Sequence, residues 1–319
     1  MRSPTNSGAA TDTTSALSAS AHLEGGFRYE QAGMARKAIA AYEAALSAGA
    51  TLLERADAHL RLARVHRSDS DWDEAVREAR VAVRLAEQAG SDDLAAEAMN
   101  VEVGVYQLRG EFDAADAVAV AALARARAPR VRGILLQNRG SVAAQRGRFN
   151  EASALFAESV EAFQQSGYEL GMAIALNNAS AAARDAGDPT QALDLAVRAA
   201  ALSRRLSAFD ILTLAVQNQA NALVALGRAD EADAPLGEVL GHYTATCNVL
   251  RQAECLEVMG SMYALRPDHD ETATRCFDLA RSLAAQVGSG VLSERIGRRL
   301  ANIKGSPRAS INEAVAARP

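Results

Sequence analysis

A glycine or polar turn residue recurs every 37 or 40 residues along most of this chain, and this period constrains the fold more than any other feature. An alanine follows each turn by five residues, and a small residue precedes most of the turns by seven. The turn residues are Gly33, Ser70, Gly110, Gly147, Gly187 and Gly227. A repeat of this length predicts one supersecondary unit per period, and such units bury their apolar faces by stacking in a linear array.

The composition predicts that the repeating unit is helical. The chain has 319 residues, of which 72 are alanine and only seven are proline. Alanine is the best helix former and proline the worst, so we predict an all-α protein with two helices per repeat and a capping helix after the last repeat. The helix pairs are expected at 21–47, 52–89, 92–127, 131–165, 169–205, 209–244 and 249–286, and the capping helix at 291–304.

Two local features refine this helix prediction. Pro235 falls inside the second helix of the sixth pair and predicts a kink or a late start there. In the capping helix, Leu292, Ile296, Leu300 and Ile303 form an apolar stripe, while Arg and Lys residues occupy its outer positions. One face of this helix is therefore expected to pack on the last repeat and the other to meet water.

The first repeat, EGGFRYEQAGMARKAIAAYEAAL, holds a small residue, an aromatic residue, a turn glycine, an alanine and a second aromatic residue in a fixed order. This pattern continues from residue 21 to about residue 287 and resembles the tetratricopeptide repeat. The 40-residue repeats, among them LNNASAAARDAG at 176–187, are similar to those of kinesin-light-chain-like and bacterial regulator-associated tetratricopeptide domains. The resemblance implies a right-handed superhelical α-solenoid whose concave groove binds a partner protein or peptide.

The seventh repeat departs from the pattern. It keeps Gly260 and Tyr263, but Pro267 replaces the turn glycine and one extra residue precedes Phe277. The register of this repeat is therefore open. The whole array, with its capping helix, is expected to span 21–304.

The terminal segments and the cysteines indicate the cellular compartment of the protein. The composition predicts disordered tails at 1–20 and 305–319. No apolar run approaches the roughly 18–20 residues that cross a bilayer, and the N-terminal segment lacks the apolar core of a secretory signal. Three cysteines without CxxC spacing, Cys247, Cys255 and Cys276, favour buried free thiols in a reduced compartment. We therefore predict a cytoplasmic protein with no membrane partner.

No motif of a hydrolase, a metalloprotease, a phosphate-binding loop or a dinucleotide-binding fold occurs, so we predict no enzyme activity and no cofactor. His59 and His66 lie seven residues apart, and Asp69, Asp71 and Asp73 follow, an arrangement that could hold a metal ion. However, His66 occupies the aromatic packing position of the repeat, and acidic residues before a helix are ordinary caps. Structural roles and no metal are therefore the prediction.

Asparagines supply the strongest functional signal. Asn138, Asn178 and Asn218 recur every 40 residues, each two residues before the small packing position. Asparagine is a mediocre helix former, and its amide both donates and accepts hydrogen bonds. The resemblance places these positions in the groove and implies that they grip the backbone of an extended peptide; a solvated face or a hydrogen bond between adjacent repeats is the alternative. Nearby inner positions hold Asn177, Asn221 and Asn100.

A second candidate binding feature is the arginine series Arg61, Arg64 and Arg67, which recurs every three residues in the second repeat. Three guanidinium groups on one face could clamp a carboxylate or an acidic stretch of a partner. Alternatively, Glu24 and Glu30 of the first repeat could pair with these arginines. A solvated, internally paired face would then result.

The net charge of the chain helps to exclude one class of binding partner. The formal net charge is -5, and aromatic residues are not interleaved with the basic ones, so we predict no nucleic-acid partner. The function predicted from the sequence is a non-catalytic interaction module that binds a protein or peptide. Two alternatives remain open: a sensor that binds a small signalling peptide or metabolite, and a scaffold that self-associates into a homo-oligomer.

Overall fold

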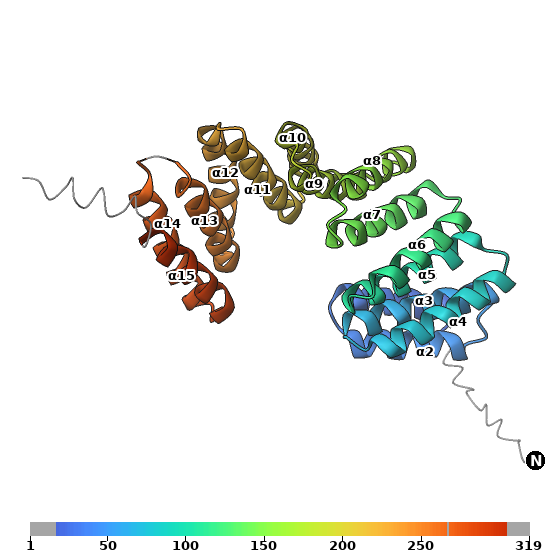
Figure 1. Ribbon diagram of the computed structural model, residues 1–319. Coiled ribbons are helices and arrows are strands. Elements are labelled where there is room, and N and C mark those ends of the chain that lie inside the picture. The colour runs from blue at the N-terminus through green and yellow to red at the C-terminus, as the bar shows by residue number, and fades with distance from the viewer. Residues whose placement is uncertain (1–16, 267, 305–319) are drawn as a thin grey trace, which may run out of the picture. The chain divides into compact units, whose positions relative to one another are not determined.

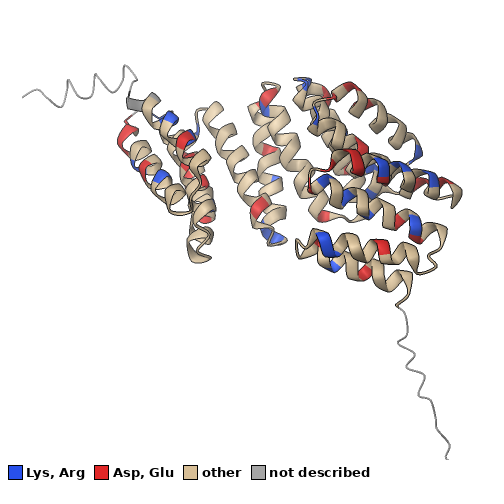
Figure 2. Ribbon diagram, turned by 90° about the horizontal axis from the view of Figure 1, so that it is seen from below, with Lys and Arg blue, Asp and Glu red and all other residues tan. Residues whose placement is uncertain are grey.

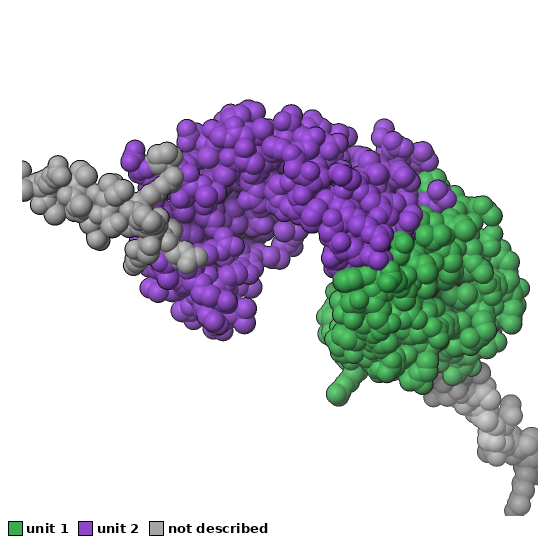
Figure 3. Space-filling model, viewed as in Figure 1, with its two compact units in different colours: residues 1–131 green, residues 132–319 purple. Residues whose placement is uncertain are grey.

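The computed structural model describes residues 17–266 and 268–304, which form helices joined by short turns, with no strand in these ranges (Figure 1). The chain divides into two compact units, residues 1–131 and residues 132–319 (Figure 3). The predicted tails lie almost entirely outside the described residues. The first helix begins at Ala19, two residues earlier than predicted. The single array over 21–304 stays a prediction.

Unit 1 consists of three helix pairs and the start of a seventh helix. Consecutive helices pack on each other, and the first helices of successive pairs are also in contact. The helices are α1 (Ala19–Gln31), α2 (Ala35–Ser47), α3 (Leu52–Ser68), α4 (Trp72–Gln88), α5 (Asp92–Leu108) and α6 (Phe112–Arg125). These bounds confirm the first three predicted pairs.

Unit 2 continues the same pattern of helix pairs and ends with a single helix. The helices are α7 (Pro129–Gln145, across the unit boundary), α8 (Phe149–Ser166), α9 (Glu169–Asp185), α10 (Pro189–Arg205), α11 (Phe209–Ala225), α12 (Asp233–Ala245), α13 (Val249–Tyr263), α14 (Asp270–Gln286) and α15 (Gly290–Lys304). The late start predicted from Pro235 is confirmed, because a 3-10 turn at Ala229–Ala232 precedes α12. Proline is tolerated there since the first turn of a helix needs no N–H donor.

The predicted turn residues all adopt the left-handed conformation, with φ between 65° and 88°. Glycine reaches this region without the steric cost that a side chain brings, and Ser70 occupies it in the second repeat. Most turns that lead from one pair to the next helix also contain a residue in this conformation, which was not predicted; the connection from α6 to α7 does not. These residues are Gly49, Gly90, Gly167, Ser207, Cys247 and Gly288.

The small packing positions bring the two helices of a pair into close contact. A Cβ atom added to Gly140 would lie 2.9 Å from the ring of Phe156. The same arrangement recurs in the seventh pair, where a Cβ atom at Gly260 would lie 3.0 Å from the ring of Phe277. This contact settles the register of the seventh repeat. Because α13 ends at Tyr263 and α14 begins only at Asp270, the extra residue falls between these two helices. Pro267 itself lies outside the described residues.

The three cysteines occupy different environments. Cys255 is buried, and its burial, together with the nearby Cys276, raises the pKa of its thiol to about 12. Cys276 is half-buried, and burial raises the pKa of its thiol too. The prediction of buried thiols is wrong for Cys247, which is exposed because it occupies the turn between α12 and α13.

Charged residues of both signs occur on both units (Figure 2). Many of them form ion pairs, such as Arg204 with Glu238 of the next repeat at 2.6 Å and Arg205 with Glu169 of the same repeat at 2.8 Å. Exposed pairs of this kind contribute about 0–1 kcal/mol each, so the stacked apolar faces carry most of the stability. No described helix combines the length and the apolar character that crossing a membrane requires.

Candidate functional site

The first helices of successive pairs in unit 2 form one continuous surface. Within it, α11 contacts both α9 and α13, and α13 contacts α15. We call the surface formed by α9, α11, α13 and α15 the first-helix face. The predicted asparagines at positions 177, 178, 218 and 221 lie on its helices.

Asn218 connects two repeats on the first-helix face. Its Nδ2 donates to the main-chain oxygen of Asn177 at 3.2 Å and to the side-chain Oδ1 of Asn177 at 2.9 Å. Its own Oδ1 accepts from Arg184 at 3.4 Å. Asn177 is only 7% exposed, so these bonds satisfy polar atoms that water barely reaches. For Asn218 the structure favours the alternative role, a hydrogen bond between adjacent repeats.

The other predicted asparagines differ in their surroundings. Asn178 is half-buried and accepts a long hydrogen bond, 3.4 Å, from Asn177. Asn138 on α7 and Asn100 on α5 are half-buried too, and each has an interaction partner. Asn221 is exposed. Asn100 belongs to unit 1 and the others to unit 2.

Replacing Asn218 by alanine is expected to lower the free energy of unfolding of unit 2 by about 1–3 kcal/mol, because the buried side-chain carbonyl of Asn177 loses its donor. Urea unfolding followed by circular dichroism measures this change. Asn221→Ala is the matched control, since it removes an exposed amide from the same helix and is expected to change stability by less than about 0.5 kcal/mol. Equal unfolding midpoints for the two variants would contradict the structural role of Asn218.

In unit 1, two of the three candidate arginines are paired within the unit. Arg61 Nε donates to Asp57 at 2.9 Å, and Arg64 Nη2 donates to Glu97 on α5 at 2.6 Å. For Arg61 and Arg64 the structure thus favours internal pairing, with other carboxylates than the predicted Glu24 and Glu30. Their partners lie on α3 and α5 and not on the first helix.

The glutamates expected as partners of these arginines have other surroundings. Glu30 accepts a hydrogen bond of 2.7 Å from the hydroxyl group of Tyr42, and no ion pair within the described residues joins Glu24 or Glu30 to the arginines. Arg67, the third arginine, is half-buried and has no hydrogen-bond acceptor within the described part of the chain.

The histidines of unit 1 contact carboxylates of the neighbouring helix and turn. His59 Nδ1 lies 2.5 Å from Glu78 on α4, and His66 Nδ1 lies 3.8 Å from Asp71, which caps α4. Across the described ranges, no group of three or more His, Cys, Asp or Glu side chains is placed to hold a metal ion.

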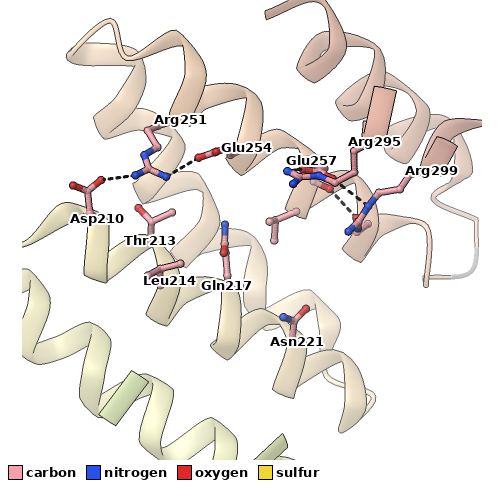
Figure 4. A pocket seen from close by; sticks show the side chains of 12 residues that line it. Asp210, Thr213, Leu214, Gln217, Asn221, Arg251, Glu254, Glu257, Arg295 and Arg299 are labelled. Atoms are coloured by element: carbon pink, nitrogen blue, oxygen red, sulfur yellow. Dashed lines mark hydrogen bonds and ion pairs between the residues drawn. The ribbon is translucent and has the colours of Figure 1, made fainter. Parts of the chain in front are cut away.

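A pocket of about 440 Å³ opens on the first-helix face of unit 2, between α11, α13 and α15 (Figure 4). One end of it carries excess positive charge. Arg295 forms a bidentate pair with Glu257, at 2.9 and 2.6 Å, and Arg299 Nε lies 3.1 Å from the same carboxylate. Glu257 is 4% exposed, whereas each arginine is about half exposed. We call this the guanidinium end, because two guanidinium groups share one carboxylate.

The opposite end of the pocket carries excess negative charge. Arg251 donates to Glu254 at 2.8 Å and lies 3.4 Å from Asp210. The hydrogen bond that Arg251 donates to Glu254 is the largest of the influences that raise the pKa of Arg251. We call this the carboxylate end, because two carboxylates share one guanidinium group. Figure 4 shows the two ends on opposite sides of the pocket.

The wall between the two ends holds amide and apolar side chains. Gln217 is half-buried and Asn221 is exposed, and neither has a hydrogen-bond partner among the described residues. Leu214 lies on the same helix and is 48% exposed. Val258 of α13 lines the pocket as well. The amides therefore have free donors and acceptors beside an apolar surface.

The sequence analysis identified Asn221 but missed Gln217. The signal was present, because Gln137, Asn177 and Gln217 also recur every 40 residues, one position before the asparagines that were chosen. Successive side chains of a helix point about 100° apart, so two adjacent residues with the same period face different surroundings. Which of them faces the pocket depends on how the adjacent helix packs.

The arginines of α15 were also missed. The predicted apolar stripe is confirmed at Leu292, Ile296 and Leu300, which are at most 5% exposed, while the side chain of Ile303 lies outside the described residues. Arg295 and Arg299 are exposed, as predicted for the basic residues of this helix. Their pairing with the buried carboxylate of Glu257 on α13 was not predicted, because the apolar stripe does not indicate it.

Comparison with known proteins identifies the repeat. Residues 132–205, which include most of α7 and all of α8, α9 and α10, match the family model of the tetratricopeptide repeat. No curated protein sequence matches the chain.

Several solved structures share the fold over most of the chain. A Rap protein complexed with Competence and Sporulation Factor has a TM-score of 0.58 and 14% identity, over 90% of this chain and 74% of its own. The apo form of RapI has a TM-score of 0.59 and 11% identity, over 90% of this chain and 97% of its own. A tetratricopeptide repeat protein from Parabacteroides merdae ATCC 43184 has a TM-score of 0.54 and 16% identity, over 90% and 99%. Residues 132–205 are therefore tetratricopeptide repeats, and the chain as a whole shares the all-α solenoid fold of these structures.

Proposed function

We propose that this protein is an interaction module that binds a peptide segment of a partner protein in the pocket between α11, α13 and α15. The observation that carries the proposal is the pair of amides, Gln217 and Asn221, which have no hydrogen-bond partner among the described residues and line a pocket with apolar and charged walls. The proposal includes no catalytic step.

The amides suit the backbone of an extended peptide. An amide side chain offers both a donor and an acceptor, which matches the two groups of a peptide unit whatever the side chain of the ligand is. Leu214, beside them on α11, provides apolar surface for a ligand side chain. Hydrogen bonds to the peptide backbone and one apolar contact with Leu214 would together give this pocket its affinity for a peptide.

The charged ends give the ligand a direction. The guanidinium end, with Arg295 and Arg299, favours an acidic group of the peptide, and the carboxylate end, with Asp210 and Glu254, favours a basic group. A peptide whose charges run in the opposite order would place like charges together at both ends. We therefore expect the pocket to prefer peptides with one acidic and one basic terminus.

The structural relatives support a binding role for this fold. The Rap protein that shares the fold was solved in complex with Competence and Sporulation Factor. At 14% identity this likeness concerns the fold, and the residues of the pocket carry the proposal for this chain.

The test uses peptides selected from a random displayed library against the whole protein. The double variant Gln217→Ala, Asn221→Ala is expected to bind the selected peptides about 10- to 100-fold more weakly, because two to four hydrogen bonds of about 0.5–1.5 kcal/mol are lost. Calorimetric titration measures the affinity.

The matched control is the double variant Asn150→Ala, Gln165→Ala, which removes the same two residue types from exposed positions of α8. Its affinity is expected to equal that of the unmodified protein. Equal losses in both double variants would contradict the pocket as the site. A selection that returns no peptide, with dimers in light scattering, would favour the self-associating scaffold instead.

A further inference from the structure

A small pocket lies in unit 1, beside the turn between α1 and α2. It has a volume of about 270 Å³ and is lined by residues of this turn and of the adjoining ends of α1, α2 and α3, namely Glu30, Gly33, Ala35, Val65, Ser68 and Asp69. Pockets that hold small-molecule ligands measure about 300–1,000 Å³, so this one suits a single side chain. We call it the turn pocket.

Two carboxylates line the turn pocket, and neither forms an ion pair with a cation in the described part of the chain. Asp69 directly follows the last residue of α3 and is exposed. Glu30 lies in the last turn of α1 and accepts a hydrogen bond of 2.7 Å from the hydroxyl group of Tyr42. The C-terminal end of a helix carries a partial negative charge, so both carboxylates lie where the helix dipole disfavours them. A cation in the pocket would offset this repulsion.

The third and seventh repeats have an arginine where the second repeat has Asp69. The position is the one directly before the turn of the repeat, and Arg109 and Arg266 occupy it there. Arg109 Nη2 lies 2.5 Å from Asp73, three residues after the turn of the preceding pair. Arg266 Nη1 lies 3.5 Å from Asp230, which holds the same position in the pair before it. The place that corresponds to the turn pocket thus receives a guanidinium group once in each unit.

The first two repeats lack the residues that fill this place elsewhere. Two positions after its turn, the second pair has Trp72, whose ring centre lies 5.9 Å from the guanidinium group of Arg109, whereas the first pair has Ala35. Arg36 takes the position of Asp73, but it is exposed and forms no ion pair among the described residues. A small side chain and reversed charges therefore accompany the open pocket.

We propose that the turn pocket binds one arginine side chain of a partner protein, in the place that an arginine of the chain itself holds in the third and seventh repeats. The two carboxylates and Arg36 together leave one negative charge in excess, which a single guanidinium group balances. Its planar fork matches a carboxylate with two parallel hydrogen bonds. Val65 and Ala35 provide apolar surface for the stem of the side chain. This site lies in unit 1 and does not depend on the pocket of unit 2.

The test follows the backbone amide of Gly33, which lines the turn pocket, by two-dimensional NMR of the whole protein. The signal is assigned from its loss in Gly33→Asn, because asparagine tolerates the left-handed conformation of this turn. The probe is a terminally blocked peptide with one arginine between glycines, and the same peptide with citrulline is the neutral control of equal shape. The arginine peptide is expected to shift the Gly33 signal to saturation, while the citrulline peptide leaves it in place.

Three variants separate binding in the pocket from general attraction to a negative surface. Asp69→Asn is expected to weaken the binding about tenfold, because a charge-assisted hydrogen bond is lost. Glu43→Gln removes the same charge from an exposed position of α2 and is expected to leave the affinity unchanged. Ala35→Trp places a ring where the second pair has Trp72, so the pocket is filled and the binding is expected to be lost. Circular dichroism at 222 nm checks that each variant keeps its helices.

Several results would overturn the proposal. These are an unmoved Gly33 signal with the arginine peptide, an equal shift with the citrulline peptide, equal losses for Asp69→Asn and Glu43→Gln, and full affinity in a folded Ala35→Trp variant. A lysine peptide is titrated separately, and tighter binding than that of the arginine peptide would reject the assignment to a guanidinium group. Because every readout lies in unit 1, these outcomes are independent of the peptide pocket in unit 2.

Discussion

Replacing Phe163 by alanine is expected to lower the free energy of unfolding of unit 2 by about 3–5 kcal/mol. The ring is 1% exposed and lies against two glycines, since a Cβ atom at Gly133 would be 2.7 Å from it and one at Gly171 would be 2.9 Å from it. Tyr168 packs against it edge-on, with ring centroids 5.4 Å apart. The glycines have no side chains that could fill the space, so the cavity would persist.

Urea unfolding followed by circular dichroism at 222 nm measures the effect of Phe163→Ala. Leu279→Ala is the control, because Leu279 is 51% exposed on α14 and its loss leaves no cavity. We expect this control to change stability by about 0.5 kcal/mol or less. Similar midpoints for the two variants would mean that the contact of α7, α8 and α9 around the ring is looser than the structure shows.

The second large effect is expected at Glu257. Replacing it by alanine leaves two guanidinium groups without their shared carboxylate. Breaking a fully buried pair costs about 3–5 kcal/mol, and because Arg295 and Arg299 are about half exposed we expect about 2–3 kcal/mol here. The loss should be concentrated in α15, whose attachment to α13 includes these ion pairs.

Hydrogen exchange of the α15 amides, together with urea unfolding, measures the effect of Glu257→Ala. Glu271→Ala is the matched control: Glu271 also pairs with an arginine, Arg275, but the two side chains are 81% and 77% exposed. An exposed pair of this kind is expected to contribute about 0.5 kcal/mol or less. Unchanged exchange in α15 for Glu257→Ala would show that the apolar stripe alone holds this helix.

Most of the fold could be predicted from the sequence because every repeat carries the same information. The turn residues mark the end of each first helix. Pro235 predicts a kink or a late start in α12, and the structure shows the late start. The connection in the seventh pair could not be placed, since one extra residue fits equally well before or after the turn. Only the contact between Gly260 and Phe277 decides it.

The candidate site could be predicted much less well. Asn218 and Gln217 are adjacent, polar and equally periodic, yet one binds Asn177 and the other faces the pocket. They differ in where the neighbouring helix lies, and the repeat period does not predict that position. The same holds for Arg64 and Arg67, which have equal spacing but differ in the presence of Glu97 on α5.

The attachment of α15 has a consequence for incomplete chains. Arg295 and Arg299 belong to the last described helix, Gly290–Lys304, and they supply the whole guanidinium end of the pocket. A chain cut by a protease or terminated before residue 290 would keep the earlier helix pairs and the amides of α11. If the proposed function holds, such a fragment would keep the amides that bind the peptide backbone but would no longer distinguish peptides by their acidic end. Removing α15 would therefore separate backbone binding from charge selection.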